Sequence, residues 1–396
     1  MLLIRIRCFL FHFDAVNKPD FLALTGECTD VWILLLLTIH VQSDISPLFL
    51  APYLFFKSGE MGVYMKSGYL ILFSGCILTL LLPAKLISED LYWHSLPCLS
   101  QGKVLSDSNI SLYLSRYGLD TIGSYPIIGT FKSDSFICVG QIYRPRGPSL
   151  GTVIFLHGLS DHLGTNLNGI IACLKENYTF AAFDLPGHGL SSGSRGGIGD
   201  FSEYAKSLHL FLQTCDTLLK PPLVFIGHST GCAVALEYVN STSNQPFSRM
   251  IFLAPLVRSS SYHFSSFGLK IFRYFKISPR RWTRNSSHDK EIKKRFHNDP
   301  LQPSIFPLKW AEAYFRWFER IKDMPPKELP LTVIQGTDDN VVDWKYNLEW
   351  FEKKIKGLRV IRLDGARHNL LNESKQYRQK CLDAMQMLFK ELDKQN

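Results

Sequence analysis

Residues 225–239 read FIGHSTGCAVALEYV, in which a short apolar run meets Gly-His-Ser-Thr-Gly and then a stretch typical of a helix. Ser229 lies between Gly227 and Gly231, at the point where a strand would end and a helix would begin. Glycine on both sides indicates a backbone too tight for a Cβ atom, or the close approach of another group. We therefore expect a sharp strand–turn–helix that exposes the hydroxyl of Ser229.

Strands and helices alternate from about residue 100 onward. Helical periodicity covers segments such as 201–219 and 374–392. Short apolar runs occur at FICVGQIY (136–143), TVIFLH (152–157), FAAFD (180–184), LVFIGH (223–228), MIFLAP (250–255), LTVIQG (331–336) and LRVIRL (358–363). This alternation predicts an α/β fold, with a mostly parallel central sheet covered by helices on both faces.

Chemically useful side chains follow three of these apolar runs, and in such sheets ligands bind beyond the carboxyl ends of the strands. Ser229 follows the fourth run, Asp338 and Asp339 follow the sixth, and His368 follows the seventh. Serine, acid and histidine in this chain order are typical of nucleophile-elbow hydrolases. A serine hydroxyl needs a base to remove its proton, so we predict Ser229 as nucleophile and His368 as base. Either aspartate could orient the imidazole.

Other polar residues near these positions are predicted to be structural. His157 and His188 lie in glycine-containing loops that would shape and support the site. Asp343 is predicted to cap a helix over 344–355, and Glu373 is predicted to lie at a helix start rather than to act as a second acid. The helix after Ser229, expected from about Cys232, would direct its free N–H groups toward a developing negative charge.

Five stretches carry a resemblance to a known family. Residues from about 125 to 396 resemble the lysophospholipase and monoacylglycerol-lipase branch of the α/β-hydrolase superfamily. The stretches are FLHGLSDH (155–162), FDLPGHGLSSGSRGGIGDFSEYAKSL (183–208), FIGHSTG (225–231), QGTDDNVVDW (335–344) and GARHNLLNES (365–374). The resemblance implies an α/β-hydrolase fold with a helical cap inserted at about 256–328.

The resemblance also assigns roles within the site. In this family the acid is the fourth residue of a Gly-x-x-Asp turn before a Val-Val pair, which here is Asp339. The backbone N–H groups of Leu159 and Thr230 are implied to form the oxyanion hole. Family members often have Met or Gln where this chain has Thr230, and a β-branched residue there still supplies its N–H group.

The implied function is a serine hydrolase that cleaves the acyl ester of a single-chain lipid, a lysophospholipid or a monoacylglycerol, through an acyl-enzyme. No cofactor and no metal are expected. A carboxylesterase or a peptidase relative of the same fold is the alternative within the enzymes. The alternative that is not an enzyme is a catalytically silent α/β-hydrolase domain used for binding. All three triad residues are nevertheless present in this chain.

The first 87 residues differ in composition from the rest. Residues 67–84, SGYLILFSGCILTLLLPA, contain no charge over 18 positions, which is long enough for a membrane span and also resembles a secretory signal. We expect an apolar N-terminal extension at 1–64, an anchor or signal segment at 65–87, and the hydrolase domain at 88–396. The domain is then expected to be membrane-associated through 67–84 and to lie outside the cytoplasm.

One segment inside the expected cap carries a positive charge nearly as large as the formal net charge of the whole chain, +9. Residues 270–295 contain ten Lys and Arg residues against Asp289 and Glu291, with aromatic residues such as Trp282 between them. Basic segments with apolar side chains suit anionic lipid headgroups, so we predict an anionic membrane surface as a partner. A solvated helix face is the alternative. Nucleic acid is not expected, because no recognised binding module is present.

Overall fold

The computed structural model describes residues 92–242, 245–260, 262, 268 and 285–394, together with four strands nearer the N-terminus. The chain divides into two compact units, residues 1–87 and 88–396. The strands of the first unit form an antiparallel sheet: β1 (Arg5–Phe13), β2 (Trp32–His40), β3 (Tyr53–Lys57) and β4 (Glu60–Tyr64). The predicted anchor or signal at 67–84 lies outside the described residues. Among the helices that are described, none combines the length and the apolar character needed to cross a membrane.

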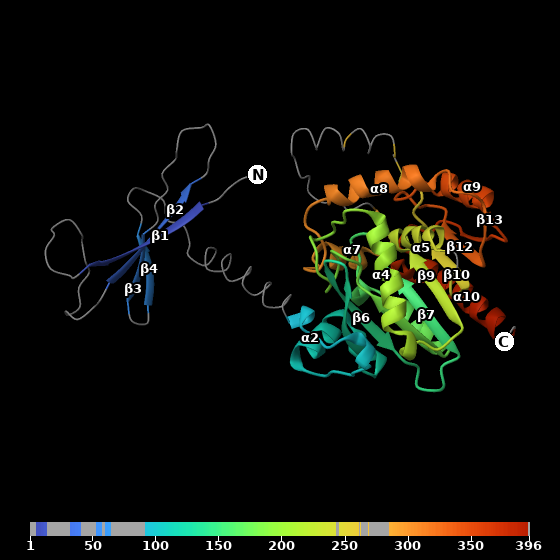
Figure 1. Ribbon diagram of the computed structural model, residues 1–396, viewed down its shortest axis with the longest axis horizontal. Helices are drawn as coiled ribbons and strands as arrows, with labels where there is room; N and C mark the ends of the chain where they lie inside the picture. Colours follow the sequence, from blue (N-terminus) through green and yellow to red (C-terminus); the bar gives the residue numbers. More distant parts are fainter. Residues whose placement is uncertain are drawn as a thin grey trace. The chain divides into compact units, whose positions relative to one another are not determined.

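The second unit is built on an eight-stranded sheet with the order β14-β12-β10-β9-β7-β8-β6-β5 (Figure 1). Its first six strands in this order run parallel, and β6 and β5 complete one edge in antiparallel pairing. The bounds are β5 (Ile127–Ser133), β6 (Phe136–Tyr143), β7 (Gly151–Leu156), β8 (Tyr178–Phe183), β9 (Leu223–His228), β10 (Phe247–Leu253), β12 (Leu331–Gly336) and β14 (Arg359–Leu363). The predicted mostly parallel α/β sheet is therefore confirmed.

Strand β5 is absent from the sequence-based expectation, although all seven predicted strands are present. Its sequence IIGTFKS has a weak strand signal, because Gly129 interrupts the apolar run. A Cβ atom at Gly129 would lie 2.6 Å from the carbonyl oxygen of Pro97, so the glycine is needed for a close backbone contact. The helix expected over 201–219 is shorter, since α4 (Phe201–Thr214) ends at Cys215 and a 3₁₀ turn follows.

Helices cover both faces of the sheet (Figure 1). One face packs against α4, α5 (Thr230–Ser241), α8 (Leu308–Ile321) and α9 (Trp344–Lys354). The opposite face packs against α2 (Ser108–Tyr117), α3 (Leu167–Lys175) and α10 (Lys375–Asp393). The remaining elements are α7 (Lys290–His297), the two-residue strands β11 (Lys327–Glu328) and β13 (Ile355–Lys356), and the 3₁₀ turns η1 (Leu99–Gln101), η2 (Leu119–Ile122), η3 (Leu163–Thr165), η4 (Asp216–Leu218) and η5 (Leu370–Asn372).

Alternate residues of the central strands supply the two cores. In β7, Ile154 and Leu156 pack on the face covered by α4 and α5, whereas Val153 and Phe155 pack on the face covered by α3 and α10. All six residues of β7 are buried. A strand that is buried on both faces is apolar at most positions, which explains why these segments read as nearly continuous apolar runs.

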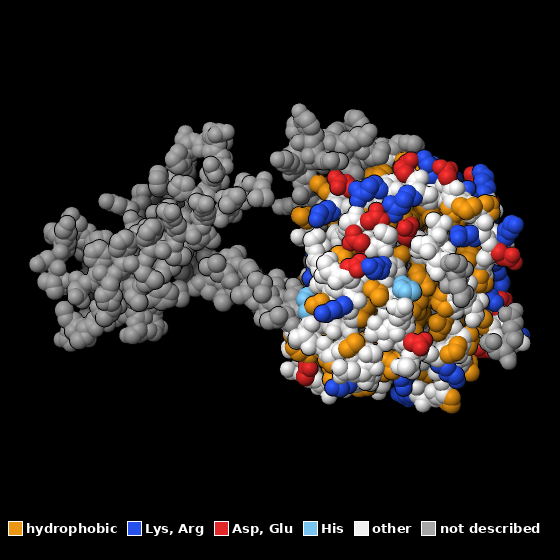
Figure 2. Space-filling view, viewed as in Figure 1, with side chains coloured by type: hydrophobic (Ala, Val, Ile, Leu, Met, Phe, Trp, Pro, Cys, Tyr) orange, Lys and Arg blue, Asp and Glu red, His pale blue; other side chains and the backbone are white. Residues whose placement is uncertain are grey.

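The inserted segment between β10 and β12 is described in part. Its helix α8 is amphipathic, and Trp317 is fully buried and stacks on Phe201 of α4 with ring centroids 5.1 Å apart. Helix α7 is capped by Asp289, whose side chain accepts the N–H groups of Glu291 and Ile292. Most of the predicted basic segment, residues 270–284, lies outside the described residues. On the face shown in Figure 2, Lys and Arg side chains of the second unit are interspersed with Asp and Glu.

Candidate active site

Ser229 occupies the turn between β9 and α5, as the glycine pattern predicts. Its backbone has a φ of 49° and a ψ of −109°, a conformation that non-glycine residues rarely adopt. Such strain costs of order 1–3 kcal/mol and persists where the surroundings hold it. Here Ser229 N donates to the carbonyl oxygen of Leu253 at 3.0 Å, and Ser229 O accepts from the N–H of Leu256 at 3.2 Å. Two hydrogen bonds, one to the last residue of β10 and one to the loop that follows it, therefore hold the turn.

The two flanking glycines allow close backbone contacts. A Cβ atom at Gly231 would lie 2.2 Å from the carbonyl oxygen of Leu156, at the end of β7. A Cβ atom at Gly227 would lie 2.8 Å from the backbone nitrogen of Cys232. Glycine at both positions lets the first turn of α5 cross directly over the end of β7. Helix α5 begins at Thr230, two residues earlier than the sequence suggested.

His368 and Asp339 form a buried hydrogen-bonded pair. His368 Nδ1 and Asp339 Oδ2 are 2.8 Å apart, and Asp339 Oδ1 accepts the N–H groups of Val341 at 2.8 Å and Val342 at 3.1 Å. Burial alone would raise the pKa of Asp339, but the His368 imidazole and these N–H groups hold that pKa below its ordinary value. Asp339 is therefore ionised at neutral pH. It fixes the proton of His368 on Nδ1 and leaves Nε2 able to accept another proton.

Asp338 has a different environment. Its side chain is about half exposed and pairs with Arg367, with 3.0 Å between Asp338 Oδ2 and Arg367 Nε. The sequence motif alone does not say which of the two aspartates orients His368. In the structure their positions differ, since Asp339 is the one that contacts His368.

His228 connects the serine turn to the histidine loop. Its Nε2 donates to the carbonyl oxygen of His368 at 3.2 Å, and the two imidazole rings lie 5.0 Å apart. Burial, followed by the proximity of His368, lowers the pKa of His228 to about 4, so this side chain is neutral at pH 7. Because His228 precedes Ser229, the bond places His368 beside the turn. The described side chains include no direct hydrogen bond between Ser229 Oγ and His368 Nε2.

Leu159 and Thr230 lie against each other at the start of α5. The N–H of Leu159 donates to the hydroxyl oxygen of Thr230 at 3.2 Å. Thr230 is fully buried, and its own N–H is one of the free donors at the helix N-terminus. The structure therefore brings together the two residues that the family resemblance implies for the oxyanion hole. Their catalytic role remains a prediction.

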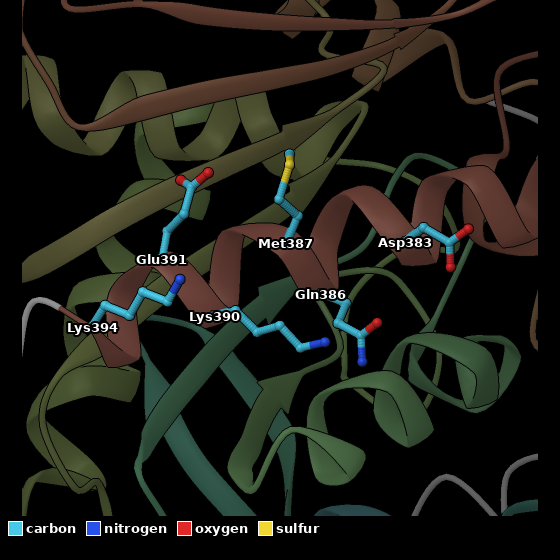
Figure 3. Close-up of a pocket in the computed structure, with 6 residues that line it drawn as sticks. All are labelled: Asp383, Gln386, Met387, Lys390, Glu391 and Lys394. Carbon is cyan, nitrogen blue, oxygen red and sulfur yellow. The ribbon is translucent and has the colours of Figure 1, made fainter.

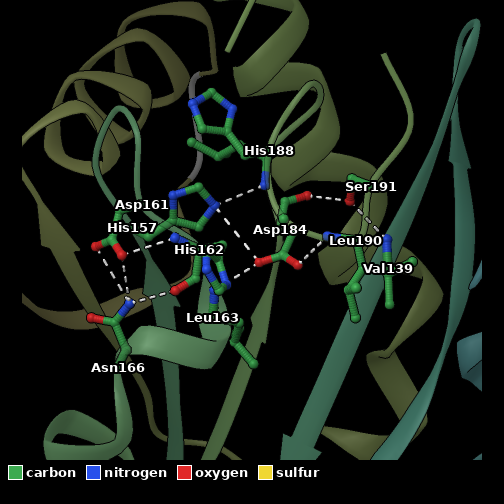
Figure 4. Close-up of polar contacts among 12 residues, drawn as sticks. Val139, His157, Asp161, His162, Leu163, Asn166, Asp184, His188, Leu190 and Ser191 are labelled. Carbon is green, nitrogen blue, oxygen red and sulfur yellow. Dashed lines mark hydrogen bonds and ion pairs between the residues drawn. The ribbon is translucent and has the colours of Figure 1, made fainter. Parts of the chain in front are cut away.

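A buried polar network supports the loop that carries Leu159 (Figure 4). His157 Nδ1 donates to the carbonyl oxygen of Gly158 at 2.8 Å, and its Nε2 accepts the N–H of Leu185 at 3.0 Å. Both ring nitrogens of His157 are occupied, so it has no free position for acid–base chemistry. Asp184 accepts the N–H groups of Leu163 at 2.7 Å and Leu190 at 2.8 Å.

His188 belongs to the same network (Figure 4). Its ring lies 5.3 Å from that of His157, and its Nδ1 is 3.1 Å from the carbonyl oxygen of Pro186. Burial, followed by the proximity of His157, lowers the pKa of His188 to about 3. Burial likewise lowers the pKa of His157 to about 3. Both imidazoles are neutral in the folded protein above about pH 3.

Two further residues support the His368–Asp339 pair: Gln335, which is absent from the sequence-based prediction, and Glu373, which the sequence places only at a helix start. Gln335 Nε2 donates to Asp339 Oδ2 at 3.1 Å. Gln335 is itself fully buried in strand β12. A glutamine in a strand that is otherwise mostly apolar is a signal of such a partner, because buried amides are hydrogen-bonded. Glu373 is completely buried and accepts the N–H groups of Arg367 at 3.0 Å and His288 at 3.0 Å. Its carboxylate ties the His368 loop to the inserted segment, and the α10 N-cap is the next residue, Ser374.

Two surface hollows lie among the described residues, and none of the three predicted triad residues lines either of them. One, of about 380 Å³, follows α10 (Figure 3) and is lined by Asp383, Gln386, Met387, Lys390, Glu391 and Lys394. The other, of about 660 Å³, lies between residues 194–197 and residues 297–309. Within the described part of the chain, no group of three or more His, Cys, Asp or Glu side chains is arranged to hold a metal ion.

Comparisons with known proteins agree with this architecture. A family model described as Hydrolase_4, serine aminopeptidase S33, matches residues 147–375. Phospholipase YtpA of Bacillus subtilis is 24% identical over 235 residues, covering 57% of this chain and 90% of that protein. The putative monoglyceride lipase of Schizosaccharomyces pombe is 27% identical over 215 residues, covering 50% of this chain and 56% of that protein.

Solved structures share the fold at low sequence identity. A soluble variant of monoglyceride lipase from Saccharomyces cerevisiae superposes with a TM-score of 0.59 and 16% identity, covering 68% of this chain and 97% of that one. The monoacylglycerol lipase of Paleococcus ferrophilus gives a TM-score of 0.54 and 21% identity, covering 63% and 97%. The likeness at these identities is one of fold.

Replacing His188 with Asn is expected to flatten the pH dependence of stability. In the unfolded chain His188 takes up a proton below about pH 6.5, whereas the folded protein does so only near pH 3. The unfolded state therefore binds more protons in this window, and stability falls as the pH decreases from about 6.5 to 3. Each such histidine contributes a slope of about 1.4 kcal/mol per pH unit. Urea unfolding at several pH values measures the slope, and H188N is expected to lower it by about that amount. H209N, a change at an exposed histidine, is the control; equal slopes for H188N and wild type would contradict the prediction.

The two adjacent aspartates are expected to respond very differently to the same substitution. Asp339→Asn keeps the side-chain shape but removes the charge that orients His368, so turnover of an ester is expected to fall by about 10³–10⁴. Asp338→Asn removes a half-exposed charge that lies 3.0 Å from Arg367 Nε and 3.7 Å from His288 Nε2, and it is expected to change turnover by no more than about threefold. Steady-state rates of the two variants show which aspartate is the catalytic acid. A larger loss of turnover in D338N than in D339N would assign that role to Asp338.

Proposed function

The chain belongs to the Hydrolase_4 family, the serine aminopeptidase S33 α/β-hydrolases, and on this premise we propose that it hydrolyses acyl esters of single-chain lipids through an acyl-enzyme on Ser229. The observation that carries the proposal is the buried His368–Asp339 hydrogen bond beside the strained turn of Ser229. This arrangement supplies an oriented base next to a hydroxyl that is held at the end of a strand. Nucleophilic acyl transfer requires His368 Nε2 to come within hydrogen-bond reach of Ser229 Oγ, and the bond from His228 to the His368 carbonyl supports this by holding the histidine loop beside the turn.

In the first half of the proposed reaction, Ser229 Oγ attacks the acyl carbonyl carbon while His368 Nε2 takes the hydroxyl proton. Asp339 stays ionised and stabilises the imidazolium that forms. The N–H groups of Leu159 and Thr230 bind the oxyanion of the tetrahedral intermediate. Collapse of this intermediate breaks the bond to the alcohol, which leaves with the proton from His368, and the acyl group remains on Ser229.

In the second half, water replaces the alcohol. His368 takes a proton from the water as its oxygen attacks the acyl-enzyme, and a second tetrahedral intermediate forms in the same oxyanion hole. The proton then returns to Ser229 Oγ, and the fatty acid is released. Each proton that His368 accepts is given back within the same half-reaction, so the enzyme ends in its starting state.

Support for a single-chain lipid substrate comes from the relatives. Their names include a phospholipase from Bacillus subtilis and a putative monoglyceride lipase from Schizosaccharomyces pombe. We propose a lysophospholipid or a monoacylglycerol as the substrate class of this chain. The family description names an aminopeptidase, so a peptide substrate is the alternative that the experiment must separate.

We also propose that the enzyme works at a membrane surface. The uncharged run at 67–84 would hold the chain at the bilayer, with the hydrolase domain outside the cytoplasm. The cationic stretch at 270–295 would attract anionic headgroups through its excess of eight positive charges. The face shown in Figure 2 has Lys and Arg side chains mixed with Asp and Glu, and the attraction is assigned to residues 270–295 because of their charge excess in the sequence.

A substrate panel with a Ser229→Ala control tests the proposed reaction. Purified full-length protein in detergent is offered lysophosphatidylcholine, monooleoylglycerol, p-nitrophenyl butyrate and alanine p-nitroanilide. Wild type is expected to release fatty acid from one or both lipids and nitrophenol from the ester, and to leave the anilide intact. Loss of the nucleophile is expected to reduce these rates by about 10⁶. Cleavage of the anilide alone would instead assign an aminopeptidase, and equal rates in S229A would remove Ser229 from the mechanism.

Salt dependence tests the membrane-surface proposal. Screening shortens the reach of exposed charges from about 10 Å at 0.1 M salt to about 3 Å at 1 M, so hydrolysis in anionic vesicles should fall with salt while short-ester hydrolysis should not. Replacing Arg280, Arg281 and Arg284 together with Gln is expected to reproduce this selective loss. The matched control changes Lys345, Lys353 and Lys356, which are exposed and lie elsewhere. An equal effect of the two triple variants would contradict a specific role for this stretch.

A further inference from the structure

The hydroxyl of Thr230 has an unusual position in the candidate site. Its oxygen accepts the N–H of Leu159 at 3.2 Å, and this N–H is one of the two backbone donors assigned to the oxyanion hole. Thr230 is fully buried. Among the described residues, no acceptor receives the proton of this hydroxyl. The side chain therefore accepts one hydrogen bond and retains an unused donor.

An unused buried donor needs a physical explanation. A buried hydroxyl without an acceptor costs about 1–3 kcal/mol, and valine fills the same shape without that cost. Threonine also has no advantage over valine as a helix residue. The bond from Leu159 explains the hydroxyl oxygen, because valine would leave that N–H without its acceptor. Among the described residues, nothing comparable explains the hydroxyl proton.

The expected position of the oxyanion supplies a reason. In the proposed reaction the oxyanion forms beside Ser229, against the N–H groups of Leu159 and Thr230. Because the Thr230 oxygen accepts the N–H of Leu159, the hydroxyl would lie next to that oxyanion. An acceptor that enters there comes within reach of the unused hydroxyl proton, and a charged oxygen is the acceptor that such a donor binds most strongly.

We propose that the Thr230 hydroxyl is a third donor of the oxyanion hole, in addition to the two backbone N–H groups. This inference rests on the proposed esterase function. In the resting enzyme, the hydroxyl oxygen accepts the N–H of Leu159, and this N–H is shared with the oxyanion once the oxyanion forms. In the tetrahedral intermediate, the hydroxyl donates its hydrogen bond to the oxyanion and keeps its proton, so no bond to hydrogen is broken. The donor is satisfied only when negative charge has developed, and its effect therefore belongs to the transition state.

The test compares Thr230→Val, Thr230→Ser and wild type on p-nitrophenyl butyrate, with full-length protein. Valine removes the hydroxyl at nearly constant shape. The loss of one oxyanion-hole donor lowers kcat by about 10²–10³ in well-studied cases, and a side-chain donor that adds to two backbone groups is expected to account for about 10–100-fold. KM is expected to change little, because the neutral substrate carbonyl gains less from the donor. Serine keeps the hydroxyl and is expected to restore most of kcat.

The control is Thr121→Val, which removes an exposed threonine hydroxyl distant in sequence from Thr230 and is expected to leave kcat unchanged. Melting temperatures of all variants distinguish a loss of folding from a loss of transition-state binding. A Val variant that folds like wild type and is equally active or faster would overturn the proposal, and a faster rate would identify the hydroxyl as an occupant of the hole. A wild type inactive on every ester of the panel would instead contradict the proposed function itself.

Discussion

The close crossing of α5 over the end of β7 is the constraint on which the candidate site depends. Gly231 permits it, because any side chain there would meet the carbonyl oxygen of Leu156. This crossing brings Thr230 against Leu159 and forces Ser229 into its positive-φ turn. The nucleophile position and the predicted oxyanion donors are thus consequences of one backbone contact, and the loop network around Asp184 holds the other side of that contact.

Burial governs the electrostatics of the site. His157, His188 and His228 are all buried, and each has a pKa lowered far enough to be neutral at pH 7. Asp339 is also buried but stays ionised, because His368 and two backbone N–H groups compensate the lost hydration. The result is a single fixed negative charge directed at the base, within a set of neutral histidines. A base with this partner can accept a proton from a hydroxyl and return it.

Sequence reasoning reached the parts of this structure that leave a local pattern. Apolar runs predicted the central strands, because a strand buried on both faces has few polar positions, and the glycines around Ser229 predicted the turn. The choice of Asp339 over Asp338 required the family register, since adjacent aspartates are equivalent in composition and differ only in their direction. Hydrogen bonds between residues far apart in the chain left little signal in the sequence. The bonds between Glu373 and His288 and between Leu159 and Thr230 depend on how distant segments pack together. Strand β5 was missed because Gly129, a weak strand former, serves a backbone contact there.

The central claim is that the hydroxyl of Ser229 is an activated nucleophile, and chemical labelling tests it most directly. A fluorophosphonate forms a covalent bond with an activated serine, and peptide mass spectrometry locates the adduct on the full-length chain. The account predicts one adduct, on the peptide that contains Ser229, which disappears in the Ser229→Ala variant and forms much more slowly in the Asp339→Asn variant. An adduct on another serine, or no adduct on a folded protein, would contradict the account.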